Sequence, residues 1–224
     1  MGPGSHFIFA FVTASALCCA ADPSALVFDR IDAASKTFVG LTADITENDH
    51  NAVVNEDDIR TGAIKLARDK AGLIRVLIEY KGNHTDKLAF DGHEGLVYHP
   101  KTNILDVFDM AKYQGAVNQY LALGFGASSA ELKSAYDITY LGEEKIGTAG
   151  TAHLKLVPKS ADTKKNLKQA ELWYGSNGLI AQQKLVMPSG DYRMVTFSSV
   201  KTGAVAEKDL ELKPKGATRH KIEQ

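Results

Sequence analysis

The sequence is poor in cysteine, and both of its cysteines, Cys18 and Cys19, lie in the first twenty of its 224 residues. A chain that loses this segment contains no disulfide and no reactive thiol. Neither sign of charge dominates, because 26 Lys and Arg residues balance 27 Asp and Glu residues, so nothing indicates a nucleic-acid partner. The six prolines and 44% hydrophobic content exclude a collagen-like or disordered chain and indicate a globular protein.

Long apolar runs are also missing, and the most apolar stretch is the uncharged segment 7–20 (FIFAFVTASALCCA). It is shorter than the roughly 20 residues that a membrane-spanning helix needs, and it ends in small residues. This pattern predicts a cleaved secretory signal over residues 1–20, although no Lys or Arg precedes it. A buried apolar segment and an uncleaved anchor are the alternatives. We expect residues 21–224 to form a single exported domain in the periplasm, because no linker, charge block or repeat divides them.

Motifs of the common enzyme chemistries are missing as well. None of the seven histidines stands in an HExxH or HxH pattern, and no GxSxG nucleophile turn is present. His93 and His99 are the closest pair to a metal site, and solvated turn positions explain them better. The sequence therefore predicts no catalytic residue, no metal and no cofactor, and it favours binding over catalysis.

What the sequence does contain is a succession of short segments with strand-like alternation and β-branched or aromatic residues. Turn signals such as Asn177-Gly178 join neighbouring segments, which predicts antiparallel pairing. Helical spacing predicts helices over 24–35 and 110–123, and Ser128 is a candidate cap for a third, short helix. The expected strands are 41–46, 61–69, 73–80, 86–91, 95–99, 103–109, 136–142, 151–158, 168–175, 179–187, 190–200 and 209–214.

Some of these strands are apolar on both faces. In 73–80, Ile74 and Val76 fall on one face, while Leu73 and Leu77 fall on the other. A sheet with one solvated face would not need both. We therefore expect a strongly curved sheet with one face against helices or a cavity.

The order of motifs resembles that of the LolA/LolB-like group of periplasmic lipoprotein carriers, over residues 24 to 218. No single motif is specific, and the resemblance depends on their occurring in the same order. The segments that carry it are GAIKLAR (62–68), LAFDG (88–92), VYHP (97–100), HLKLVPK (153–159) and LELKPKG (210–216).

The resemblance implies a mainly β fold, an incomplete and strongly curved antiparallel barrel of about eleven strands whose open side is covered by a helical lid. It implies a monomeric carrier, not an enzyme, that holds the acyl chains of lipoproteins in an apolar cavity. The implied partners are an inner-membrane exporter and an outer-membrane acceptor. A carrier of another lipid or glycolipid, or an envelope-stress sensor of lipid or lipoprotein, is the alternative.

Strand parity selects a candidate lining for the acyl cavity, although each member could equally be a core residue without ligand contact. The family's strand arginine, which contacts the lid and controls its opening, corresponds to Arg68. The proline that follows it in the family is Asp69 here, and an exposed Arg68 paired with an acid is the alternative. The candidate lining consists of Ile64, Leu66, Ile74, Val76, Ile78, Tyr80, Leu88, Phe90, Val97, Leu105 and Val107.

Overall fold

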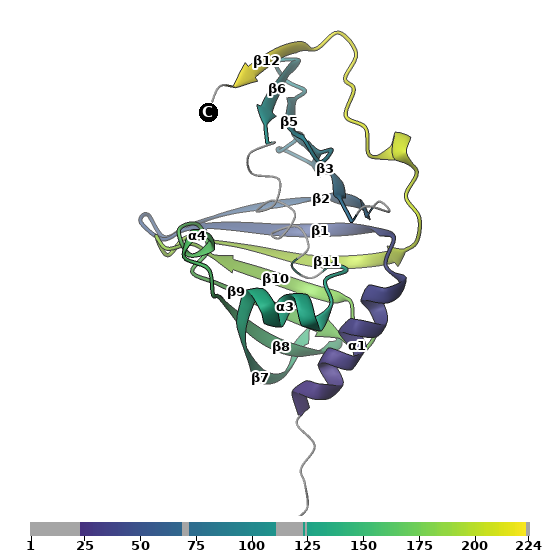
Figure 1. The fold of residues 1–224 in the computed structure, drawn as a ribbon. Helices are drawn as coiled ribbons and strands as arrows, with labels where there is room; N and C mark the ends of the chain where they lie inside the picture. The colour runs from purple at the N-terminus through teal and green to yellow at the C-terminus, as the bar shows by residue number, and fades with distance from the viewer. Residues whose placement is uncertain (1–22, 69–71, 111–122, 124, 223–224) are drawn as a thin grey trace, which may run out of the picture.

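The computed structural model describes residues 23–68, 72–110, 123 and 125–222 (Figure 1). The expected signal segment and almost all of the helix expected over 110–123 lie outside these residues. One twelve-stranded sheet dominates the described chain. The elements are α1 (Pro23–Thr37), β1 (Gly40–Asn51), β2 (Glu56–Arg68), β3 (Ile74–Lys81), β4 (Lys87–Phe90), β5 (Glu94–His99), β6 (Ile104–Asp109), α3 (Ser129–Ala135), β7 (Tyr136–Ile146), β8 (Ala149–Pro158), α4 (Ala161–Lys164), β9 (Gln169–Gly175), β10 (Ile180–Val186), β11 (Tyr192–Thr202), η2 (Glu207–Asp209) and β12 (Thr218–Ile222).

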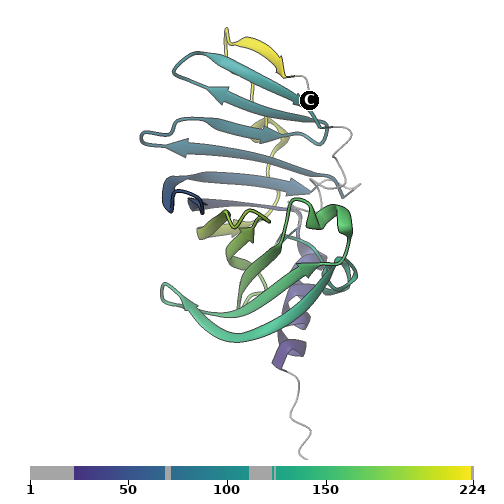
Figure 2. The same cartoon turned by 90° about the vertical axis from the view of Figure 1, so that its left-hand side faces the viewer.

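The strands follow the order β12-β6-β5-β4-β3-β2-β1-β11-β10-β9-β8-β7. Every neighbouring pair is antiparallel except β12 and β6, which run parallel. Strands β7 and β12 end the sheet, which therefore stays open, and Figure 2 shows its strong curvature. Helices α1 and α3 lie across the part formed by β7 to β11 (Figure 1). The predicted fold class, a curved open sheet with helices over one side, is confirmed.

The predicted hairpin at Asn177-Gly178 is confirmed and also positions the first helix. Gly178 has a positive φ of 72°, which favours glycine. A Cβ at this position would lie 2.2 Å from the backbone oxygen of Arg30 in α1. The turn between β9 and β10 therefore packs against the helix backbone at a distance that only glycine allows.

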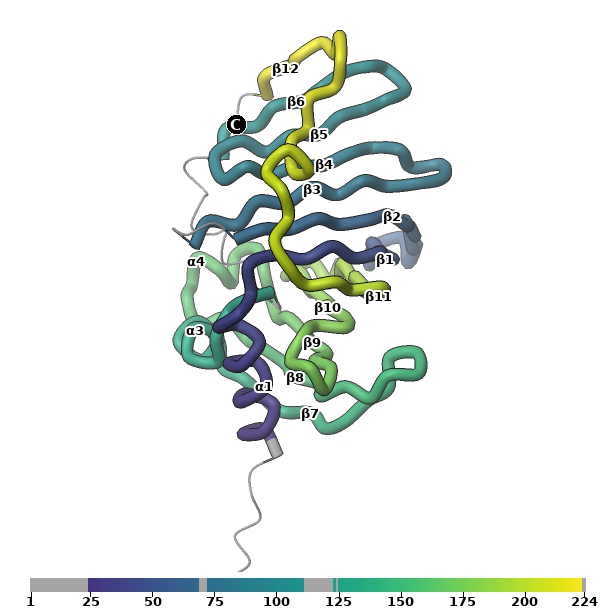
Figure 3. The backbone as a smooth tube through the Cα atoms, turned by 90° about the vertical axis from the view of Figure 1, so that its right-hand side faces the viewer, coloured from purple at the N-terminus to yellow at the C-terminus, as the bar shows by residue number. Residues whose placement is uncertain are grey.

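The segment 209–214 is not the strand that its alternation predicted. Asp209 ends η2, and residues 210–214 continue in the strap, the chain between β11 and β12, which crosses the outside of the sheet (Figure 3). Leu210 and Leu212 are buried there against the convex face, so the alternation reflects side-chain packing and not backbone pairing. The last strand is instead β12, whose polar sequence TRHKI gave no strand signal.

Two apolar clusters explain why the strands are apolar on both faces. The larger one fills the concave side, where α1 and α3 meet the sheet, and includes Leu41, Leu66 and Leu154. The smaller one lies on the convex side, where the strap covers Leu77 and Leu96. Among the described residues, no helix has the length and apolar character needed to cross a bilayer.

Candidate functional site

The concave face contains a mostly apolar, partly enclosed cavity of about 120 Å³. Strands β1, β2, β3, β10 and β11 supply its walls, and Phe125 closes it from the opposite side. A volume of this size is below the roughly 300–1,000 Å³ of common ligand sites. The lining residues are Ile45, Glu47, Ile64, Leu66, Ile78, Phe125, Gln183, Leu185, Arg193, Val195 and Phe197.

Nine of the eleven candidate lining residues lie on this concave face. Ile64, Leu66 and Ile78 line the cavity itself, and Ile74 lines a second pocket near the lid. The others share the face through cross-strand pairing, because partners directly opposite each other point to the same side. These pairs are Leu66 with Val76, Gly62 with Tyr80, Val76 with Phe90, Ile78 with Leu88, and Leu88 with Val97.

The placement predicted for Leu105 and Val107 is wrong. Leu105 is paired with Tyr98 and Val107 with Leu96, and both belong to the convex cluster. Val97, which faces the concave side, is paired with Asp106. The turn between β5 and β6 thus sets a register one residue away from the one assumed, and such a shift moves every side chain to the other face.

Residues 123 and 125–127, here called the covering segment, belong to the lid that the resemblance implies. The sequence did not single out Phe125, the residue of this segment that lines the cavity, because its patterns indicated only the end of a helix here. Phe125 is 4% exposed and contacts Phe197 edge-to-face, with 4.9 Å between the ring centroids. Its ring also stacks on Phe38, at 6.5 Å. The buried Gln183 donates a hydrogen bond from Nε2 to the backbone oxygen of Leu123, at 3.2 Å. An apolar ring and one hydrogen bond to β10 therefore hold this covering segment on the sheet.

Helices α1 and α3 are joined at their facing sides. Asp32 of α1 accepts hydrogen bonds from both the backbone nitrogen and the Oγ of Ser129, each at 2.7 Å. Ser128 caps α3 in a reciprocal arrangement with Glu131, which confirms the predicted cap. Lys133 also places its ammonium 3.8 Å from the ring centroid of Phe28. The two helices therefore form one connected cover.

This connection is expected to weaken in acid. The hydrogen bonds from Ser129 hold the pKa of Asp32 below its ordinary value of 3.8. Their contribution is therefore complete above about pH 4 and is lost as the pH falls through the lower pKa of the folded state. We expect Asp32→Asn to cost on the order of 1 kcal/mol at neutral pH. Urea unfolding of both proteins at neutral pH and at about pH 3 should show this difference shrinking in acid. A constant difference would contradict the assignment.

Arg68 lies where the covering segment and α3 meet the sheet. A Cβ on Gly126 would be 3.1 Å from the Arg68 Cζ, and Arg68 also acts electrostatically on Glu131. Its Nε is buried and has no hydrogen-bond partner among the described residues. The pocket at this point, about 360 Å³, is lined by Arg68, Gly72, Ile74, Leu123, Ala127, Glu131, Leu132, Ser134, Ala135 and Tyr136. Arg68 thus points toward the lid, while control of the lid by Arg68 stays a prediction.

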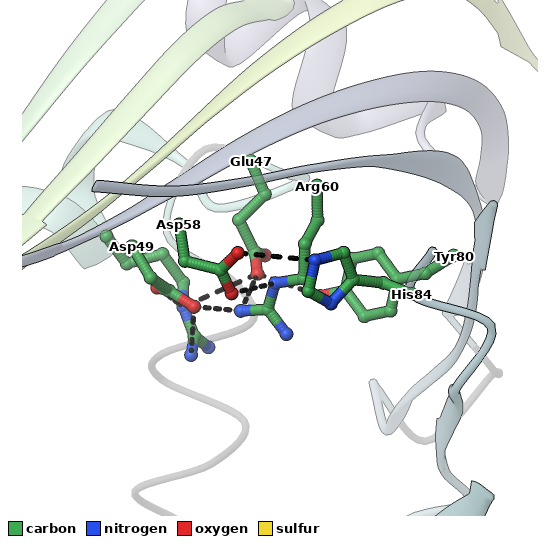
Figure 4. A network of polar contacts seen from close by, with 7 residues as sticks. Glu47, Asp49, Asp58, Arg60, Tyr80 and His84 are labelled. Carbon is green, nitrogen blue, oxygen red and sulfur yellow. Dashed lines mark hydrogen bonds and ion pairs between the residues drawn. The ribbon is translucent and has the colours of Figure 1, made fainter. Parts of the chain in front are cut away.

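A network of charged side chains adjoins the cavity through Glu47 and Arg193, which line it (Figure 4). Glu47 is only 3% exposed, and its carboxylate accepts a hydrogen bond from the Tyr80 hydroxyl at 2.9 Å. Arg60 forms ion pairs with Glu47, at 2.7 Å, and with Asp49. Burial, followed by the charge of Glu47, raises the pKa of Tyr80. Tyr80, predicted as part of an apolar lining, therefore contributes a hydrogen-bond donor.

The site thus combines an open curved sheet, a helical cover and a mostly apolar cavity on the concave face. The sequence matches no protein-family model and no curated protein. MucB and a Thermus thermophilus protein are among the solved structures that are similar in fold. MucB has a TM-score of 0.51 and 17% identity over 87% of this chain, which spans 64% of the MucB chain. An uncharacterized conserved protein from Thermus thermophilus has a TM-score of 0.53 and 14% identity, covering 90% of this chain and 100% of its own.

A LolA superfamily protein from Nitrosomonas europaea is more distantly similar, with a TM-score of 0.41 and 11% identity over 86% of this chain and 99% of its own. The similarity to MucB and to the Thermus thermophilus protein shows the arrangement of the backbone and nothing of the ligand. The particular function of this chain must therefore be argued from its own side chains.

Proposed function

We propose that this protein is a non-enzymatic periplasmic carrier that holds the acyl chains of lipoproteins on the concave face of its sheet. The observation that carries the proposal is the apolar cavity beneath a separable cover, with Phe125 as its closing residue. The cover has its own polar attachments, at Gln183 and Asp32, and neither hydrogen bond belongs to the backbone ladder of the sheet. An exporter in the inner membrane would supply the cargo, and an acceptor at the outer membrane would receive it.

The energetics of acyl binding suit a cavity that is small when closed. Each buried methylene contributes about 0.8 kcal/mol, so a sixteen-carbon chain gains on the order of 12 kcal/mol. A preformed cavity of full size would hold such a chain too tightly for transfer. Here the chain must first displace the covering segment, and the cost of that displacement is subtracted from its affinity.

Mass spectrometry of the protein isolated from its periplasm without detergent tests the proposal directly. Intact complexes and extracted lipids should both be measured. Stoichiometric acylated lipoproteins are the expected result. Free lipid without lipoprotein would point instead to a shuttle or sensor of another lipid or glycolipid. An empty protein that also takes up no acyl probe would contradict a carrier of either kind.

Arg68 is expected to restrain the cover. Because its guanidinium lies against Gly126 and near Glu131, Arg68→Ala should loosen the closed state and speed both uptake and release of an acyl probe about two- to tenfold. The rates of uptake and release in Arg68→Lys should lie between those of the wild type and those of Arg68→Ala. Lys81→Ala removes an exposed positive charge elsewhere and serves as the control. Stopped-flow fluorescence gives the rates, and unchanged uptake and release in Arg68→Ala would remove Arg68 from the site.

A further inference from the structure

The polar residues of the cavity are gathered at one end. Glu47 and Arg193 line it there, and Gln183 lines it beside the covering segment. These three side chains extend from β1, β11 and β10, and Val195 is paired directly with both Glu47 and Gln183. The cavity therefore has an apolar body and a polar end, which is the shape expected for a site that binds an amphiphile by its chain.

The charges at this end are unequal. Three carboxylates, Glu47, Asp49 and Asp58, surround two guanidinium groups, Arg60 and Arg193, so this set carries one excess negative charge. His84, 3.3 Å from Asp58, adds a positive charge only when it is protonated. The most buried of these groups is the Glu47 carboxylate, which faces the cavity.

Both cations at this end are already paired. Arg60 contacts all three carboxylates. Arg193 donates from Nε to Asp49 at 2.7 Å and lies 3.9 Å from Glu47. Among the described residues of the network, no guanidinium is therefore left to neutralise an anionic ligand. An acyl chain ending in a free carboxylate would place a second buried negative charge beside Glu47, which is strongly unfavourable.

A neutral end group meets a different environment. In the closed state the Nε2 of Gln183 donates to the backbone oxygen of Leu123. When the covering segment moves away, this amide donor is left without its partner on the wall of the cavity. A carbonyl oxygen of an ester or amide is an acceptor of the same kind as the one lost, so it can replace the bond.

We propose that this polar end makes the cavity selective for acyl chains that terminate in an uncharged ester or amide, and that it rejects fatty-acid anions. Glu47 supplies the repulsion and Gln183 the replacement hydrogen bond. Discrimination of this kind needs a repulsive element as well as an attractive one. The inference rests on the proposed function, because it assumes that the cavity receives an acyl chain, and it adds the chemistry of the chain's end.

The test is a displacement titration with a neutral fluorescent acyl probe at neutral pH. The competitors are hexadecanoate and the glycerol monoester of the same acid, both kept below micelle-forming concentrations. The wild-type protein is expected to bind the ester about tenfold or more tightly than the anion. Glu47→Gln should reduce this ratio to about threefold or less by raising affinity for the anion. Gln183→Leu should weaken ester binding and leave hexadecanoate little changed.

Two further variants keep the result interpretable. Asp49→Asn removes one charge from the same network at a more exposed position. It should lower the ratio of ester affinity to anion affinity, as Glu47→Gln does, and it provides the test if Glu47→Gln folds poorly. Asp57→Asn removes a carboxylate from the convex face of the same hairpin, where Asp57 contacts His50, and should leave the ratio unchanged. Equal or tighter binding of hexadecanoate by the wild type would overturn the inference and leave the carrier intact. Failure to bind any acyl probe would overturn both.

Discussion

Replacing Phe125 with alanine is expected to increase affinity for a neutral acyl probe about tenfold or more. Phe125 occupies the concave face that an acyl chain would use, packed against Phe197 and Phe38 and lining the cavity. Ring and chain therefore compete for the same surface. Removing the ring adds no contact to the acyl chain, but it makes the closed state of the protein easier to leave.

The expected size follows from the cost of the truncation. Converting a fully buried phenylalanine to alanine lowers the free energy of unfolding by about 3–5 kcal/mol. Each 1.4 kcal/mol by which the closed state is weakened relative to the open one raises apparent affinity about tenfold. The alanine retains part of the contact, and Gln183 still holds Leu123, so only part of this cost, about 1.4 kcal/mol or more, weakens the closed state relative to the open one.

Fluorescence titration measures the change, and Leu77→Ala provides the matched control. Leu77 is a similarly buried apolar residue, but it lies in the convex cluster under the strap. Its truncation should lower the free energy of unfolding and leave probe affinity unchanged. Weaker probe binding by Phe125→Ala would contradict the competition and make Phe125 part of the ligand's own site.

Local patterns predicted the parts of this fold that depend on local physics. The Ser128 cap and the Asn177-Gly178 turn were predicted correctly because their hydrogen bonds and φ angles involve only neighbouring residues. Alternation likewise located most of the strands. The same alternation misled at 209–214, where Leu210 and Leu212 pack by side chain alone against strands more than a hundred residues earlier.

The candidate site was predicted less completely, because it depends on register and on distant contacts. The concave placement of Ile64 and Leu66 follows from the alternation of side chains within one strand. Placing Leu105 and Val107 also required the register across the turns between strands, which the sequence does not give. Glu47 gave no signal at all. A glutamate in a strand usually faces solvent, and only Arg60, Tyr80 and Arg193, from three other strands, make its burial tolerable.

Filling the cavity should have the opposite effect to removing its cover. Val195 is 9% exposed and lines the cavity beside Glu47, its directly paired neighbour on the adjacent strand. In Val195→Phe the added ring would occupy the space of about 120 Å³ from the sheet side, where it cannot move away as the covering segment can. We expect probe affinity to fall about tenfold or more, because the chain loses surface that it must bury.

The size of the accompanying stability change separates blocking from unfolding. Overpacking a core position costs about 1–3 kcal/mol, which leaves a domain of this size folded. Val186→Phe is the matched control, since Val186 lies on β10 of the same sheet and pairs with Tyr192 on the convex side. It should bind the probe as the wild type does. If Val195→Phe melts cooperatively yet binds the probe normally, acyl chains do not enter this cavity, because no chain could share it with a fixed phenyl ring.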